Sequence, residues 1–123
     1  MLLLEKNVKL IVMNKDNDGN DLSELNEKII KLLTNTFGGT TVSESFGTWE
    51  DNNNKIYQDP NKVIQCNYHH LDGNMIKNVF KAVQMELQQG KQEAVSLLIN
   101  DKLAIIEPTD NFDKVQGFIN LFK

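Results

Sequence analysis

The chain has 123 residues, 40% of them hydrophobic, and a formal net charge of −4. A chain of this length normally builds one core, so we expect a single domain over residues 1–123. All 13 basic residues are lysines, and they are interspersed with acidic residues. This pattern argues against nucleic-acid binding, because such surfaces are basic and often use arginine. No apolar run is long enough to cross a bilayer, so we expect no membrane partner.

The first part of the chain predicts a strand followed by a helix. Val8–Met13 is short, apolar and rich in β-branched residues, as central strands are. Asp21 and Glu24 have the spacing of a capping box, which predicts that a helix begins at Leu22. Gly38 follows the last apolar residue of this helix and is expected to end it.

A long hairpin is predicted next. Thr40–Trp49 is rich in β-formers, an Asn-rich turn follows, and Lys62–Tyr68 alternates between the two faces of a sheet. Pro60 suits a strand edge or a bulge. The alternation places Ile64, Cys66 and Tyr68 on one face, and Val63, Gln65 and Asn67 on the other.

The second half of the chain predicts another helix and a short hairpin. Asp72 or Asn74 caps the helix, and Gly90 ends it. Ala94–Ile99 and Leu103–Ile106 are apolar runs on either side of the turn-forming pair Asn100 and Asp101, which is typical of a tight hairpin.

A last helix completes the predicted fold. Asp110 is its expected cap, and its apolar stripe either closes the core or meets a second subunit; we favour the core. The order β-α-β-β-α-β-β-α indicates an α+β protein in which an antiparallel sheet carries its helices on one face. The stripe consists of Phe112, Val115, Phe118, Ile119 and Phe122.

The familiar catalytic and metal-binding patterns are missing. Asn14–Gly19 resembles the start of a calcium loop, but Leu25 stands where a bidentate Glu is required, so we expect a solvated loop. His69 and His70 are adjacent and would point to opposite faces of a strand. The single Cys66 lies mid-strand and suggests a structural role in a reducing compartment. We therefore predict no catalytic residues, no metal site and no cofactor.

The long hairpin is the candidate binding surface. It contains Trp49, Tyr57 and Tyr68, which offer flat faces for stacking a base, and Gln65 and Asn67, whose amides can bond a base edge. The alternative is that these aromatic side chains fill the core between sheet and helices.

The stretch from residue 37 to residue 64 resembles a pattern in small bacterial and phage proteins, and on this basis the chain is similar to the phage Thoeris anti-defence sponge family. The pattern consists of Phe37–Val42, Phe46–Trp49 and Lys55–Ile64. The resemblance implies a homo-oligomer that sequesters a cyclic ADP-ribose signal without cleaving it. Because the chain has no arginine, Lys28, Lys62 and Lys102 are the candidates to meet phosphate.

These observations lead to one main functional hypothesis and two alternatives. The main hypothesis is a non-enzymatic protein that sequesters a small nucleotide immune signal in the cytoplasm of a bacterial host cell and so counteracts anti-phage defence. The first alternative is an oligomeric protein-interaction module with no small-molecule ligand. The second is an enzyme that uses His69 or His70 as a general base.

Overall fold

The computed structural model describes residues 1–123 and confirms the predicted order β-α-β-β-α-β-β-α. The bounds differ from the predicted ones by a few residues, as element ends usually do. The elements are β1 (Lys6–Met13), α1 (Ser23–Phe37), β2 (Thr41–Glu50), β3 (Ile56–Tyr68), α2 (Gly73–Gln88), β4 (Val95–Ile99), β5 (Lys102–Ile106) and α3 (Phe112–Phe122).

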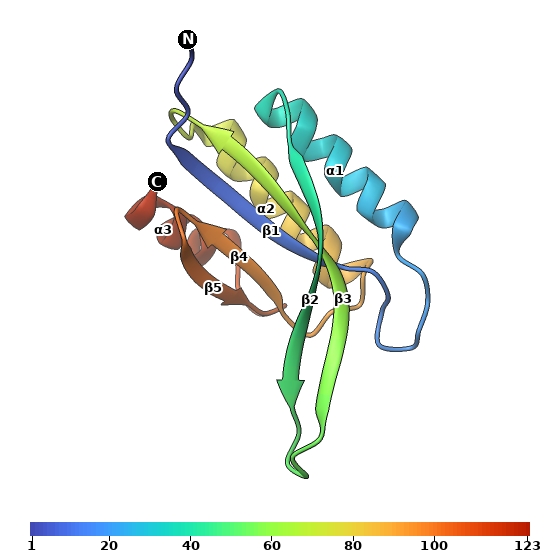
Figure 1. Cartoon of the computed structure of the whole chain (residues 1–123). Coiled ribbons are helices and arrows are strands. Elements are labelled where there is room, and N and C mark those ends of the chain that lie inside the picture. Colours follow the sequence, from blue (N-terminus) through green and yellow to red (C-terminus); the bar gives the residue numbers. More distant parts are fainter.

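The strands form one five-stranded sheet in the order β2-β3-β1-β4-β5, and every neighbouring pair is antiparallel. The helices pack against one face of this sheet, with α2 between α1 and α3 (Figure 1). The predicted α+β class, with an antiparallel sheet and helices on one face, is therefore confirmed. The other face of the sheet carries no helix.

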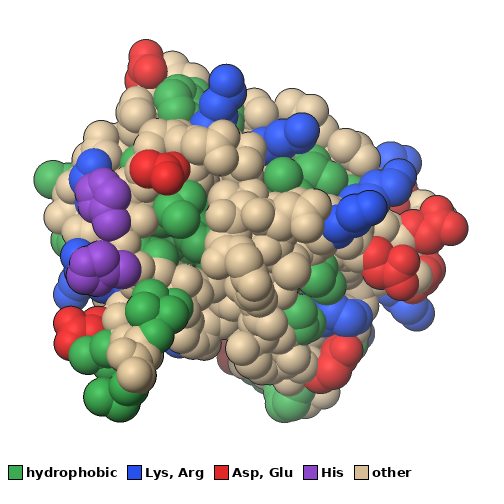
Figure 2. Space-filling model, turned by 90° about the horizontal axis from the view of Figure 1, so that it is seen from above, with side chains coloured by type: hydrophobic (Ala, Val, Ile, Leu, Met, Phe, Trp, Pro, Cys, Tyr) green, Lys and Arg blue, Asp and Glu red, His purple; other side chains and the backbone are tan.

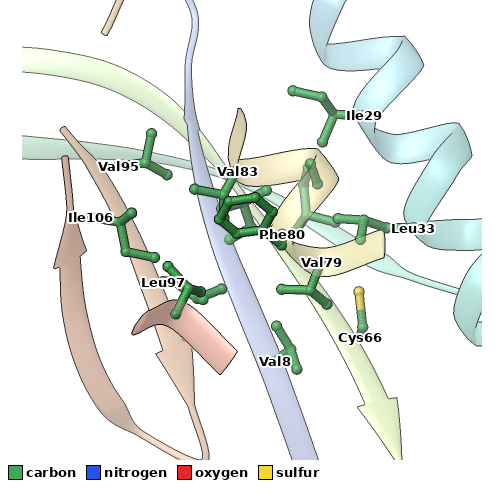
Figure 3. Close-up of a cluster of buried hydrophobic side chains, with 14 of the residues drawn as sticks. Val8, Ile29, Leu33, Cys66, Val79, Phe80, Val83, Val95, Leu97 and Ile106 are labelled. Atoms are coloured by element: carbon green, nitrogen blue, oxygen red, sulfur yellow. The ribbon is translucent and has the colours of Figure 1, made fainter. Parts of the chain in front are cut away.

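One hydrophobic cluster of 23 residues fills the space between sheet and helices (Figure 3). Alternate residues of β1 supply its centre, because successive side chains of a strand point to opposite faces. Val8, Leu10 and Val12 are at most 1% exposed, and Cys66 of β3 is fully buried beside them. α3 adds Val115 and Ile119 to the same cluster, which agrees with the favoured core role of its apolar stripe.

β2 and β3 continue beyond the rest of the sheet as a two-stranded ribbon (Figure 1). β1 ends at Met13, opposite Asn61, whereas the pairing of β2 with β3 runs on to Glu50 and Ile56. Pro60 lies just past the end of β1. Its missing N–H therefore does not cost the sheet a hydrogen bond between strands. Its carbonyl accepts a hydrogen bond from Asn14 N at 3.1 Å, which ties the chain after β1 to the base of the ribbon.

Two of the predicted N-caps are wrong, and one is confirmed. α1 has Leu22 at its N-cap with no side-chain cap, because the carboxylate of Asp21 bonds the hydroxyl and the N–H of Ser23 instead. The cap of α3 is Asn111, not Asp110. Asp72 caps α2 as predicted, by accepting from Met75 N at 2.8 Å. None of the helices has the length and apolar character needed to span a bilayer.

Candidate functional site

The largest hollow of the molecule lies at the C-terminal end of β1, where the ribbon leaves the sheet. It has a volume of about 500 Å³, which is within the usual range for small-molecule sites of roughly 300–1,000 Å³. Its lining is mainly polar and comes from the loop after β1, from the base of the ribbon and from the loop after α2. The lining residues are Met13, Asn14, Lys15, Asp16, Asn17, Gly19, Asp59, Pro60 and Gln92.

The loop after β1 is organised around the carboxylate of Asp16. This carboxylate accepts hydrogen bonds from Asp18 N and Asn20 N, each at 2.9 Å, and from Asn20 Nδ2 at 3.0 Å. The Asn20 donors, first its side chain and then its backbone N–H, lower the pKa of Asp16. Gly19 adopts φ +82°, which permits the tight return of the chain. The segment that resembles a calcium loop is thus closed around its own carboxylate and forms one wall of the hollow.

Asp59 forms the opposite wall and connects the hollow to the aromatic residues of the ribbon. Its carboxylate accepts a hydrogen bond from Trp49 Nε1 at 2.8 Å. The Trp49 ring stacks on Tyr57, with centroids 4.4 Å apart and planes 13° from parallel. Tyr57 in turn donates from its hydroxyl to Asp51 at 3.1 Å. Trp49 remains 51% exposed, so this aromatic pair borders solvent and does not fill the core.

Three buried polar side chains surround the strand end next to the hollow. Asn26, Asn61 and Glu86 are 1%, 5% and 0% exposed, and each has a buried oxygen without a hydrogen-bond partner. Sequence reasoning missed all three. The available signal was the position of Glu86 on the apolar stripe of α2, three residues after Val83 and next to Leu87.

The predicted binding residues do not converge on one place. Gln65 and Asn67 lie on the helix-free face of the sheet, where Gln65 Nε2 donates to Asn67 Oδ1 at 2.9 Å. Tyr68 lies on the opposite, helix-covered face, is 2% exposed, and receives a hydrogen bond from Asn100 Nδ2 at 3.1 Å. Trp49 and Tyr57 lie together on the ribbon, away from these three.

The three candidate lysines also lie apart. Lys28 is exposed on α1, and Lys102 begins β5 at the far edge of the sheet. Lys62 of β3 is the one next to the hollow, because its ammonium group donates to Asn14 Oδ1 at 3.1 Å. It also pairs with Glu44 at 3.4 Å.

The histidines and the cysteine lie outside this site. His69 and His70 follow β3 directly and are exposed at the surface (Figure 2). Burial raises the pKa of the Cys66 thiol to about 12, so it is protonated at neutral pH. No group of three or more His, Cys, Asp or Glu side chains is arranged to hold a metal ion.

Comparison of the fold with solved structures found two related chains. One is a phage SAM lyase in complex with S-methyl-5′-thioadenosine, with a TM-score of 0.59 and 13% sequence identity, covering 87% of this chain and 95% of that one. The chain is similar in fold to this lyase. The other is a phage SAM lyase in the apo state, with a TM-score of 0.59 and 10% identity, covering 90% of this chain and 98% of that one. No protein-family model and no curated protein sequence matches the chain.

This finding corrects the functional hypotheses drawn from the sequence. The main hypothesis, a non-enzymatic protein that sequesters a cyclic ADP-ribose signal, is wrong, because the neighbours in fold are lyases. The expectation that the chain is not an enzyme is contradicted on the same ground, as is the alternative of an interaction module without a small-molecule ligand. The expectation of a small nucleotide-like ligand agrees in part with this comparison, because one of the neighbouring structures is bound to a thioadenosine.

Proposed function

We propose that the chain is an enzyme that binds S-adenosylmethionine, or a close sulfonium relative, in the hollow at the end of β1 and cleaves a carbon–sulfur bond. The observation that carries this proposal is the similarity in fold to a phage SAM lyase over 95% of that chain. The setting we propose is the cytoplasm of a bacterial host cell.

The charges around the hollow support a cationic ligand over a phosphate-bearing one. Asp16 and Asp59 are carboxylates, and Lys15 is the one cation in the lining. Lys62, next to the hollow, is paired with Glu44. A sulfonium centre is positively charged, so it is attracted by such a lining, whereas a pyrophosphate is repelled. The lack of arginine, which weighs against a phosphate ligand, is no obstacle for a sulfonium ligand.

The aromatic pair of the ribbon supports the same ligand class. Trp49 and Tyr57 stack next to Asp59 and remain partly accessible. Aromatic faces attract cations and also stack on purine bases. A ligand that combines an adenine with a sulfonium group matches both properties of this aromatic pair beside the hollow.

The proposed reaction removes the positive charge of its substrate. When the bond between sulfur and the amino-acid chain breaks, its electron pair stays on sulfur, and a neutral thioether is released. The carbon fragment either loses a proton to water and leaves as an alkene, or forms a carbon–oxygen bond with its own carboxylate and leaves as a lactone. The acidic lining therefore binds the charged substrate more strongly than the neutral thioether, which favours product release.

The helix-free face of the sheet supports the proposal of a homo-oligomer. Leu103 and Ile105 of β5 are 57% and 56% exposed on this face. Leu98 of β4 pairs with Leu103, and Ile11 and Val63 face each other across β1 and β3, which extends the apolar surface. Exposed apolar side chains on an uncovered sheet face mark an interaction site, and a second copy is the partner we propose.

A turnover assay tests the proposed activity. The purified protein is incubated with S-adenosylmethionine, and S-methyl-5′-thioadenosine is quantified by mass spectrometry. We expect enzyme-dependent formation of the thioether, and we expect Asp59→Asn to raise KM roughly 10- to 150-fold, since an interaction with a charged group contributes about 1.5–3 kcal/mol. Asp113→Asn, at an exposed position of α3, is the matched control and should leave turnover unchanged. No thioether above the enzyme-free background would refute the proposal.

A further inference from the structure

Glu86 is a carboxylic acid in the hydrophobic core. It lies on α2 and is 0% exposed. Its Oε2 accepts a hydrogen bond from Met13 N at 2.7 Å, while its Oε1 is buried without a partner. Burial raises the pKa of Glu86 to about 7, although the Met13 N–H acts in the opposite direction. A buried carboxylate with an unpaired oxygen is costly and calls for an explanation.

Glu86 acts where β1 no longer pairs with β4. The pairing of β1 with β4 covers Val8–Leu10, so the backbone of Met13 has no β4 residue beside it. Glu86 from α2 accepts from the Met13 N–H, and Asn26 from α1 donates to the Met13 carbonyl at 2.9 Å. Two helix side chains therefore complete the hydrogen bonding of the last residue of β1. The next residues of the chain, 14–17, line the hollow.

The end of α2 is shaped to fit this carboxyl group. Gly90 is buried and follows Glu86 by one helical turn. A Cβ atom at Gly90 would lie 2.8 Å from Glu86 Oε1 and would also clash with the Glu86 carbonyl group. Only glycine allows the chain to close this tightly over the carboxyl group.

The charged groups on the surrounding segments do not neutralise Glu86. Lys62 of β3 bonds Asn14 and pairs with Glu44, and the charge of Lys91, after α2, acts on Asp16. Lys28 of α1 and Lys81 of α2 are exposed on the outer surface. The influences on the pKa of Glu86 are burial and the Met13 N–H alone.

We propose that Glu86 is a positioning residue whose proton holds the end of β1 and the loop 14–17 in place, so that ligand binding in the hollow depends on pH. The protonated carboxyl keeps its bond to Met13 and gains an O–H donor. In the structure, the buried oxygens Glu86 Oε1 and Asn26 Oδ1 have no donor. Ionisation removes the O–H donor and favours arrangements in which the carboxylate reaches water. Such arrangements shift the strand end and loosen the wall of the hollow. The inference rests on the proposed function only for the identity of the ligand.

The first test needs no ligand. The amide signals of Met13 and of residues 14–19 are followed by NMR from about pH 5 to about pH 9, together with the carboxyl carbon of Glu86. We expect one common midpoint near 7, the pKa of Glu86. Glu86→Gln should abolish this transition while keeping the fold, because the amide is close to the carboxyl group in size, can accept from Met13 N and does not titrate. Glu24→Gln, exposed on α1, is the matched control and should keep it.

Two results would overturn the inference. One is a Glu86 carboxyl carbon that titrates near its ordinary value of 4.5. The other is a Glu86 that titrates near 7 while the amides of residues 14–19 do not follow it.

A calorimetric titration with S-methyl-5′-thioadenosine then tests whether the protonation of Glu86 changes ligand binding in the hollow. We expect roughly tenfold weaker binding at about pH 8 than at about pH 6 in the natural chain, and pH-independent binding in Glu86→Gln. The same pH dependence in both proteins would refute the role of Glu86. Failure of the compound to bind at either pH would instead count against the proposed function, and the NMR titration would still decide the role of Glu86.

Discussion

A single buried carboxyl group sets the pH dependence of stability that we expect for this protein. The pKa of Glu86 is raised in the folded state from 4.5 to about 7. Between these values the folded chain holds a proton that the unfolded chain has released, so stability falls as pH rises through this window. Glu86→Gln should therefore match the natural chain below about pH 4.5 and exceed it by about 3 kcal/mol above about pH 7. Urea unfolding at several pH values measures this difference; a constant difference at all pH values would contradict it.

Asn100 offers a second test at the residue scale. It adopts φ +49° in the turn between β4 and β5, its Oδ1 accepts from Asn7 N at 2.9 Å, and its Nδ2 donates to Tyr68 and to the Phe122 carbonyl. Glycine tolerates this backbone but lacks the side chain, so Asn100→Gly should cost about 1–3 kcal/mol. The matched control Asp101→Gly, at φ +69° in the same turn, should change stability by less than about 1 kcal/mol. Equal effects in thermal unfolding would show that the turn alone matters.

At the scale of the elements, the ribbon of β2 and β3 couples the hollow to a fluorescent residue. Trp49 is the single tryptophan of the chain, and its Nε1 bonds Asp59 in the wall of the hollow. Ligand binding should therefore change the intensity or wavelength of tryptophan emission, with saturation at the same concentration as in calorimetry. Asp59→Asn should raise the ligand concentration at which the emission change saturates, whereas Asp113→Asn should leave it unchanged. A saturating ligand that leaves the emission unchanged would place binding away from the ribbon.

Most elements were predictable from the sequence, and the candidate site was not. Strand alternation and helical stripes gave the order of the elements, because burial on one face imposes a fixed period. The caps at Asp21 and Asp110 were wrong because neighbouring acceptors and donors compete for the same backbone groups, which spacing does not reveal. The hollow depends on where β1 stops relative to β3 and on which helix side chains reach its end. Both features depend on tertiary contacts, which leave no local pattern in the sequence.

The whole molecule has one apolar core and one uncovered sheet face. Because all its core residues join one cluster, we propose that residues 1–123 form a single domain. The uncovered face leads us to expect a homo-oligomer in light-scattering measurements, and Ile105→Lys should dissociate it because a charge replaces an apolar contact. Leu121→Lys, exposed on α3, is the matched control and should leave the oligomer intact. If the natural protein is a monomer in this measurement, the proposal that this face joins two copies is wrong.

We propose that the ligand binds in the hollow at the end of β1. The most direct measurement is an NMR titration of the labelled protein with S-methyl-5′-thioadenosine, the compound bound by a structural neighbour. We predict that the largest shifts fall on residues 13–19, on Asp59 and on Gln92, which line the hollow. Shifts confined to Gln65, Asn67 and the helix-free face of the sheet, or no shifts at all, would contradict the claim.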